Sequence, residues 1–401
     1  MSEEAVELRG PRAAFSVVAQ RNFGPYFLGN ALSASGTWFQ NLAASLLVYR
    51  LTHSPFLLGV LNFSQFIPVL VLAPWAGAAA DRFDRKHVLL VTQTTAALLS
   101  AGLGVLALTG TVDAPTVIVF ALLLGVVSAF SAPAQQALVT SLVPPRDLGS
   151  AIALNSMTFN IARAAGPALA AATVRAFGIP VAFLVNAGSY VLFVATLLAV
   201  EPRPQQRAAG AKLRESLALL RTQPRLAWLL FVVAAVGFAS DPINTESPAF
   251  AHVFGYHDTV AGLIIGVFGA GAVTAALLFA GRSGSPRLTV ATLTLLGCAT
   301  AAFAFSPTLW IAVPFLFLAG LGYLASNARA TTQIQLEVTE AQRGRMMALW
   351  SIAFLGLRPV ASLVDGAVAG AVGVRAAGVV LAVPALAGAV VAAWAAARTT
   401  H

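Results

Sequence analysis

The most polar stretch within an otherwise apolar part of the chain places two acids between two prolines. Segment 240–248 contains Asp241 and Glu246, with Pro242 and Pro248 beside them. An acid surrounded by lipid is costly to leave ionised, so it is suited to binding and releasing a proton. On an unbroken helix the two acids would lie about 140° apart, but each proline removes a backbone donor and disturbs the helix. We therefore predict that both acids face a central cavity and that their protonation favours one access state of that cavity. The alternative is that the segment lies nearer the membrane surface, so that Glu246 is interfacial.

Arginines also occupy the interior of apolar segments, where a charge needs a partner. Arg163 and Arg358 lie too far from a segment end for their side chains to reach water easily. Asp365 lies about 10 Å along the helix from Arg358, too far for a direct ion pair, whereas a bridge from Arg358 to Asp241 is possible. Recognition of an anion and structural pairing with backbone carbonyls both remain open for these arginines. Arg329 is nearer a segment end, and we expect its side chain to extend to water.

Amide side chains and one indole complete the set of candidate cavity residues. Such amides either bind a ligand or join neighbouring helices for about 1 kcal/mol each, so both uses stay open. Together with Arg163 and Arg358, the residues that we expect to line a substrate cavity are Asn30, Trp38, Gln40, Asn41, Asn62, Gln65 and Asn244.

Residue patterns that serve metals, cofactors or nucleotides are not found in the sequence. Cys298 is the single cysteine, and the five histidines form no His-Glu-x-x-His pair. Neither Lys86 nor Lys212 follows a glycine, so a Gly-Lys-Ser/Thr phosphate loop cannot form. We predict no metal, no cofactor and no enzymatic activity. The net charge of +9 does not indicate nucleic acid, because the basic residues are isolated between apolar runs.

The composition identifies the elements that must position these residues. Hydrophobic residues make up 58% of the 401 residues and charged residues 10%, and the mean hydropathy is +0.82. Soluble domains carry about 25% charged residues, and a helix needs about 20 apolar residues to cross a bilayer. We therefore predict an all-α integral membrane protein with twelve transmembrane helices, near 23–50, 55–80, 88–109, 115–140, 148–174, 179–200, 226–252, 259–281, 288–306, 309–336, 345–371 and 374–397.

Lys and Arg residues flank these segments unevenly. Most of the 24 fall on the side that holds both termini, whereas Arg50, Arg175 and Arg375 fall on the other side. Positive residues are retained on the cytoplasmic side during insertion, so we expect a multi-pass cell-membrane protein with both termini cytoplasmic.

An internal repeat divides the chain into two equivalent halves. We expect residues 1–21 to be a cytoplasmic tail and 201–225 a cytoplasmic linker between two bundles, 22–200 and 226–398. A constant offset of about 195 residues matches several positions of the two bundles, which indicates parallel, pseudo-symmetric six-helix bundles around a midplane site. The matched pairs are Gly125 and Gly320, Ser131 and Ser326, Leu154 and Leu349, and Arg163 and Arg358.

The turn after the second segment resembles the loop motif of the major facilitator superfamily. Its motif positions are filled by Gly77, Asp81, Arg82, Arg85 and Lys86. The resemblance implies a cytoplasmic gate at this loop, with Asp81 facing the positive end of a neighbouring helix. The alternative is that Asp81 only pairs with Arg85 one turn along the helix.

Further segments resemble the drug- and siderophore-exporter branch of this superfamily, which includes macrolide-efflux and enterobactin-exporter-like proteins. They are 36–40, 51–55, 155–156, 162–167 and 343–348. The resemblance implies proton-coupled export. Thr37 stands where relatives often carry Asp, so a proton relay on the first segment is not expected.

The sequence thus predicts a transporter that exports a small amphipathic compound in exchange for protons by alternating access. Its expected partners are the substrate, protons and the lipid bilayer, and we expect a monomer that binds no nucleic acid. Uptake by proton symport is the main alternative, because the same machinery runs in either direction. An integral-membrane enzyme acting on lipid, or a receptor without transport, are further alternatives.

Overall fold

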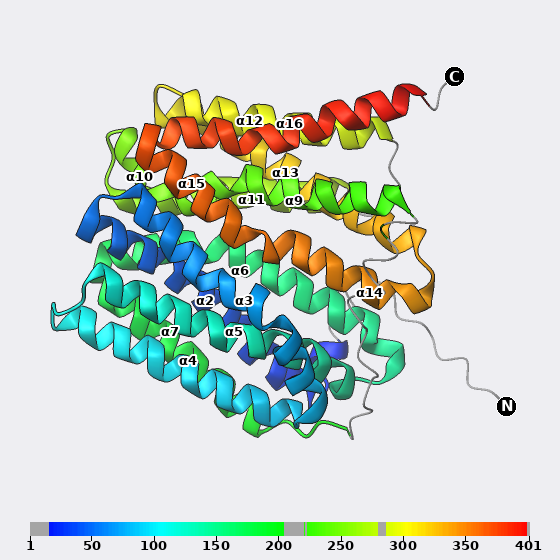
Figure 1. The fold of residues 1–401 in the computed structure, drawn as a ribbon. Helices are drawn as coiled ribbons and strands as arrows, with labels where there is room; N and C mark the ends of the chain where they lie inside the picture. The colour runs from blue at the N-terminus through cyan, green and yellow to red at the C-terminus, as the bar shows by residue number, and fades with distance from the viewer. Residues whose placement is uncertain (1–15, 204–219, 221–222, 280–285, 399–401) are drawn as a thin grey trace.

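The computed structural model describes the chain except for residues 1–15, 204–219, 221–222, 280–285 and 399–401. Most of the expected tail 1–21 and linker 201–225 therefore lies outside the described residues. All regular structure within the described part is helical. The helices run roughly side by side in two groups, with the first half of the chain in the lower part of Figure 1 and the second half in the upper part.

The amino-terminal bundle contains six long helices. They begin and end close to the expected positions, and a short 3-10 turn precedes the fifth. Their bounds are α2 (Phe23–Thr52), α3 (Pro55–Arg82), α4 (Arg85–Leu108), α5 (Ala114–Leu142), α6 (Leu148–Phe177) and α7 (Ile179–Leu198).

The carboxy-terminal bundle repeats this plan, but two of its spans are divided. The seventh span consists of α9 (Pro224–Thr245) and α10 (Ser247–Val253), and the eleventh consists of α14 (Glu340–Ser351), a π-helical turn (Ile352–Gly356) and α15 (Arg358–Val372). The undivided spans are α11 (Ala261–Phe279), α12 (Pro286–Phe305), α13 (Leu309–Glu337) and α16 (Val374–Arg398).

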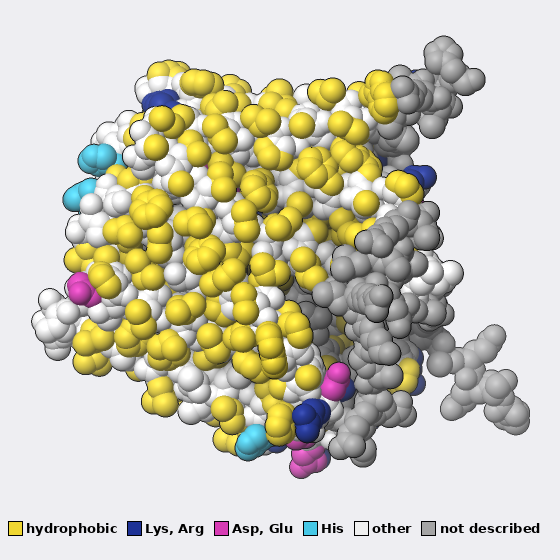
Figure 2. Space-filling view, viewed as in Figure 1, with side chains coloured by type: hydrophobic (Ala, Val, Ile, Leu, Met, Phe, Trp, Pro, Cys, Tyr) yellow, Lys and Arg dark blue, Asp and Glu magenta, His cyan; other side chains and the backbone are white. Residues whose placement is uncertain are grey.

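The composition of these helices fits a membrane environment. Ten helical segments of the described chain are long and apolar enough to cross a bilayer, and α2 and α6, each 30 residues long, complete the expected twelve. Both helices carry polar residues along their length, and in α2 the polar residues Asn30, Ser33, Gln40 and Ser45 are buried. Figure 2 shows one face of the molecule covered by hydrophobic side chains, with charged residues at its margins.

Side-chain caps fix where several helices begin. Ser54 accepts a hydrogen bond from the backbone of Leu57 at the start of α3, and Asp113 accepts one from Thr116 at the start of α5. Each cap satisfies a backbone N–H that has no partner inside the helix. The bonds from Thr116 also lower the pKa of the Asp113 carboxyl, because they stabilise its ionised form.

Helix packing explains why the internal repeat has a glycine at the same position in each half. A Cβ at Gly125 would collide with the backbone oxygen of Gln65 on α3, and one at Gly320 would collide with the backbone oxygen of Phe268 on α11. Both crossings therefore bring two helix backbones into contact, which only small residues allow. Gly271 on α11 is equally close to Phe317, as expected for glycines that permit close approach.

The two bundles meet along two helix pairs, α3 with α15 and α6 with α11. Gly59 touches Gly366 in the first pair, and Gly269 touches Ala164 in the second. These contacts lie in the halves of the helices nearer to Arg50, at the end where α2 finishes and α3 begins. We call this the Arg50 end, and the opposite end, where α3 joins α4, the Lys86 end.

We expect valine at Gly125 or at Gly320 to destabilise the protein by about 1–3 kcal/mol, because the added side chain forces apart two backbones in contact. Thermal unfolding of the purified protein in detergent measures this loss. Gly188→Val on α7 is the matched control, since an added Cβ there meets no neighbour within 4 Å. Equal melting temperatures for all three variants would contradict the assigned crossings.

Candidate functional site

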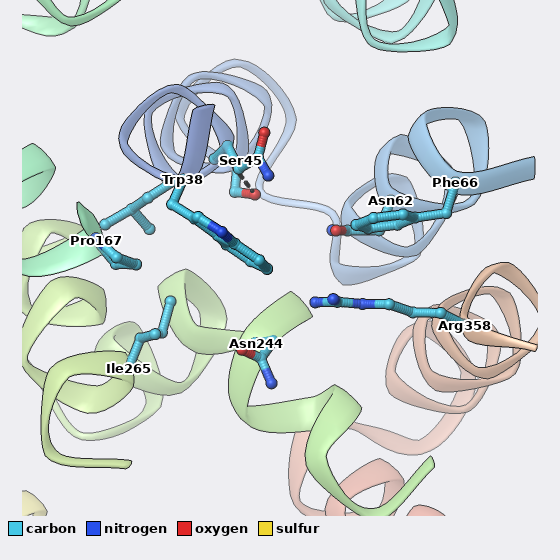
Figure 3. A pocket seen from close by; sticks show the side chains of 10 residues that line it. Trp38, Ser45, Asn62, Phe66, Pro167, Asn244, Ile265 and Arg358 are labelled. Atoms are coloured by element: carbon cyan, nitrogen blue, oxygen red, sulfur yellow. Dashed lines mark hydrogen bonds between the residues drawn. The ribbon is translucent and has the colours of Figure 1, made fainter. Parts of the chain in front are cut away.

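A small cavity lies between the two bundles. Figure 3 shows the side chains of both bundles converging on it, with the Arg358 guanidinium entering from one side and Trp38 from another. Its remaining wall residues are amides, a hydroxyl and apolar groups. The lining residues are Trp38, Asn41, Leu42, Ser45, Asn62, Phe66, Pro167, Asn244, Ile265 and Arg358.

Several residues that the sequence predicts for the cavity are among its lining. Trp38 and Asn41 come from α2, Asn62 from α3, Asn244 from α9 and Arg358 from the start of α15. These positions are far apart in the chain, and the two-bundle fold brings them together.

Gln65 supports the cavity wall without lining it. Its amide nitrogen donates to Asn41 Oδ1 at 2.7 Å, so the side chain of Asn41 is held in place from α3.

Two other predicted cavity residues lie inside the amino-terminal bundle. Gln40 is 4% exposed and accepts a hydrogen bond from Asn186 on α7 at 2.7 Å. Asn30 donates to Asn155 at 3.1 Å and accepts a bond from Gln135. The structure therefore places both amides where they join helices rather than in the cavity.

The two repeat-related arginines approach the same aromatic ring, but only Arg358 lines the cavity; Arg163, which was also expected there, lies beside it. The guanidinium carbon of Arg358 lies 5.6 Å from the centroid of the Trp38 ring, and that of Arg163 lies 6.0 Å from it. Arg358 also lies 4.5 Å from the centroid of Phe66. Arg163 donates to the Tyr323 hydroxyl and lies over the Tyr323 ring. Aromatic faces attract both cations, but they supply no opposite charge.

Carboxyl groups are buried behind this cavity, between α9 and α15. Asp241 is 2% exposed and accepts hydrogen bonds at 3.0 Å from the hydroxyls of Thr245 and Ser362. Glu246 and Asp365 are both 0% exposed, and their carboxyl oxygens have no hydrogen-bond partner among the described residues. All three are close enough to interact electrostatically, and Asp241 also interacts with Arg358.

The prolines predict an interrupted helix, and the interruption falls at Glu246, whereas Pro242 and Asp241 lie inside the continuous helix α9. Glu246 separates α9 from α10, and Pro248 stands in the first turn of α10. The interfacial alternative for Glu246 is wrong, because the side chain is fully buried in protein. The expectation that both acids face the cavity is also corrected: Asn244 lines the cavity, whereas Asp241 and Glu246 are not part of its wall, and Asp241 accepts a bond from Ser362 on α15.

Sequence reasoning missed the part that Asp365 plays in this cluster. Its spacing along the helix excludes a direct ion pair with Arg358, and the described ion pairs contain none, but the spacing does not show that Asp365 lies near Glu246 and Asp241. A useful signal was present in the sequence, since an acid within an apolar spanning segment is costly and marks a functional position. The π-helical turn just before Arg358 was not predicted either; such turns often occur at functional sites.

The predicted gate loop binds its own bundle. Arg85 donates to the backbone of Ala137 at 3.1 Å, and Lys86 donates to the backbone of Leu198 and Val200. Arg82 is exposed, Gly77 has open space beside its Cα, and Asp81 forms no hydrogen bond or ion pair with a residue that the structure describes. The pairing of Asp81 with Arg85 is therefore absent, and the gate at this loop stays a prediction.

Arg329 does not reach water, contrary to expectation. It is 6% exposed, and its Nη2 donates to the hydroxyl of Thr289 on α12 at 3.4 Å. The helix around it packs against neighbours on several sides, so the side chain has no free path along the surface.

An ion pair joins the two bundles at the Arg50 end. Arg50 at the end of α2 binds Asp258 through two hydrogen bonds, from Nε at 2.5 Å and from Nη2 at 3.0 Å. Asp258 also lies 2.8 Å from Nδ1 of His257. Because the pair is bidentate and Asp258 is nearly buried, it has the geometry of a latch that holds this end closed.

We expect Arg50→Ala to open the Arg50 end more often, by a factor of roughly five, since a half-exposed ion pair contributes about 1 kcal/mol. A cysteine in place of Ser45, in a Cys298→Ser background, reports the opening through its rate of labelling by an impermeant maleimide applied at that end. The exchanged pair, Arg50→Asp with Asp258→Arg, should restore slow labelling. Unchanged labelling in Arg50→Ala would rule out the latch.

Comparison with known proteins agrees with this architecture. The profile of the transmembrane secretion effector family matches residues 12–400. The staphyloferrin A transporter of Staphylococcus aureus is 32% identical over 174 residues, which span 43% of each chain. The multidrug efflux pump Tap of Mycobacterium tuberculosis is 24% identical over 393 residues, covering 90% of this chain and 91% of that protein.

A solved structure shares the fold over nearly the whole length. A bacterial homologue of the human lysosomal transporter Spinster, in an inward-facing and occupied conformation, superimposes with a TM-score of 0.75. The two chains are 15% identical, and the match covers 98% of each. At this identity the likeness concerns the fold.

Proposed function

The chain belongs to the transmembrane secretion effector family of major facilitator transporters, and from this premise we propose that it exports a small amphipathic compound by proton antiport. As a member of this family it is a transporter and not an enzyme. The observation that carries the proposal is the buried carboxyl cluster of Asp241, Glu246 and Asp365 beside a cavity that Arg358 lines. A relative named as a multidrug efflux pump supports the outward direction.

The surroundings of the carboxyl cluster are by themselves enough to make it suited to binding a proton. Only Asp241 receives hydrogen bonds from described residues, and they come from two neutral hydroxyls. Ionising all of these groups would place mutually repelling charges in a low-dielectric interior. A proton bound within the cluster relieves this repulsion.

Arg358 connects the cluster to the cavity. It lines the cavity and interacts electrostatically with Asp241 behind it. When Asp241 is charged, it neutralises part of the charge of Arg358; when Asp241 is protonated, Arg358 needs another counter-charge. Proton binding and substrate binding therefore act on the same guanidinium, which is how the two become coupled.

Alternating access requires the two bundles to separate at one end and to meet at the other. We assign the present arrangement, closed at the Arg50 end, to an inward-facing state with the Lys86 end on the cytoplasmic side. The reverse state would close the loop of Gly77, Asp81, Arg82, Arg85 and Lys86 against the second bundle. We propose that the protein is a monomer in the cell membrane, with both termini on the cytoplasmic side.

We expect Asp241→Asn to reduce proton-driven transport at least about tenfold, because asparagine keeps the size of the side chain but cannot carry a proton. The measurement uses everted membrane vesicles with an imposed pH gradient. Accumulation of ethidium, Nile red and fluorescein tests a cationic, a neutral and an anionic amphipathic compound, and nigericin with potassium collapses the gradient.

Glu201→Gln is the matched control, because Glu201 is an exposed acid outside the cluster. Its transport should equal that of the unaltered protein. The proposal fails if Asp241→Asn accumulates a compound as fast and with the same dependence on the gradient, or if none of the three compounds accumulates.

A further inference from the structure

The charges around the cavity identify the class of compound that it binds. We propose that the cavity binds an amphipathic organic anion, with its carboxylate or similar oxyanion held between the guanidinium groups of Arg358 and Arg163 and its apolar part against Trp38 and Phe66. This inference rests on the proposed export function and specifies its substrate class.

The first observation is an excess of positive charge. Arg358 and Arg163 both lie within 6.0 Å of the centroid of the Trp38 ring, and they interact with each other electrostatically. Neither forms an ion pair within the part of the chain that the structure describes. Asp241 offsets part of the charge of Arg358 from behind the wall, but no acid lines the cavity itself. Two converging cations at membrane depth are costly, and an anion between them would reduce that cost.

The second observation is the chemistry of the wall. None of the ten lining residues is an acid, and Arg358 directs its guanidinium into the cavity (Figure 3). The amide nitrogens of Asn62 and Asn244 each donate one hydrogen bond to their own helix, to Leu58 and Ser240, and retain a second N–H. The wall therefore offers hydrogen-bond donors beside a positive charge, which suits an oxyanion.

The third observation concerns Asp241, the nearest acid to Arg358 in the cluster. Its two carboxyl oxygens accept bonds from Thr245 and Ser362, so it acts on Arg358 from behind the cavity wall rather than within the cavity. An anionic substrate would compete with Asp241 for the same guanidinium. A cationic substrate would instead meet two arginines with no acid in reach.

The aromatic residues define the rest of the ligand. Phe66 and Trp38 form opposite parts of the wall around the guanidinium, and Ile265, Leu42 and Pro167 add apolar surface. A flat or apolar group can pack against these side chains while its charged group reaches the arginines.

The test compares three probes of one shape: 2-naphthoate, 2-naphthamide and 2-naphthylmethylamine, which are anionic, neutral and cationic. Calorimetric titration of the purified full chain should show that naphthoate binds about tenfold to a hundredfold more tightly than naphthamide. The amine should not bind measurably. Equal or tighter binding of the amide or the amine, or no binding of naphthoate, would overturn the proposal.

Variants then locate the binding. Arg358→Gln, and independently Arg163→Gln, should each weaken the binding of naphthoate at least about tenfold. Arg358→Lys should weaken this binding less, because the positive charge remains. Arg175→Gln is the matched control, since this exposed arginine lies on the same helix as Arg163 and far from the cavity. Unchanged affinity in both Arg358→Gln and Arg163→Gln, with normal melting temperatures, would overturn the proposal.

Asp241→Asn separates this inference from the transport proposal. It should strengthen naphthoate binding about threefold or more, because a competing negative charge is removed. Weaker binding in this variant would contradict the competition with Asp241. Binding can be measured without a pH gradient, so it tests the substrate class separately from antiport. If the protein binds anions selectively but shows no proton-driven flux, only the antiport proposal fails. If it transports ethidium in preference to fluorescein, only the proposed anion class fails.

Discussion

A charge placed at the depth of the hydrocarbon has to be compensated inside the protein, and this constraint organises the centre of the molecule. Hydrocarbon cannot solvate Arg358, Arg163 or the carboxyl cluster, so their compensation has to come from neighbouring helices or from a bound proton or ligand. Aromatic rings and hydroxyls supply part of that compensation. The remaining imbalance, positive in the cavity and negative behind it, is what lets a proton and a bound molecule influence one another.

The two halves of the chain share a plan but divide the chemistry. The repeat provides an arginine in each half and a glycine crossing in each half. Among the described residues, the fully buried acids, Asp241, Glu246 and Asp365, all belong to the carboxy-terminal half. The amino-terminal half supplies Trp38, Asn41 and Asn62 to the wall, and Thr37 bonds to Tyr190 instead of carrying an acid. The features that the two halves share thus form the cavity, whereas the acids that differ between the halves form the proposed proton site.

The sequence was sufficient for the helices but not for the partners of their side chains. Segment length and hydropathy predict the spans, and Pro242 with Pro248 predict an interrupted helix, because both depend on local chemistry. Whether an amide joins helices, as Gln40 does, or lines the cavity, as Asn62 does, depends on tertiary packing that no spacing encodes. The Arg50 and Asp258 pair lies beyond sequence reasoning for the same reason, since it joins positions in different bundles.

The irregular helices stand where the acids and the cavity meet. The break at Glu246 and the π-helical turn before Arg358 both interrupt the regular α-helical geometry of their spans. Such irregularity is tolerated at membrane depth only where protein or a cavity surrounds it. Glu246 therefore lies at the break between α9 and α10, and Arg358 directly follows the π-helical turn. A small change in backbone conformation at either point moves a charged side chain relative to its partner. A regular helix would hold these charges at one separation, whereas a jointed pair allows the separation to differ between access states.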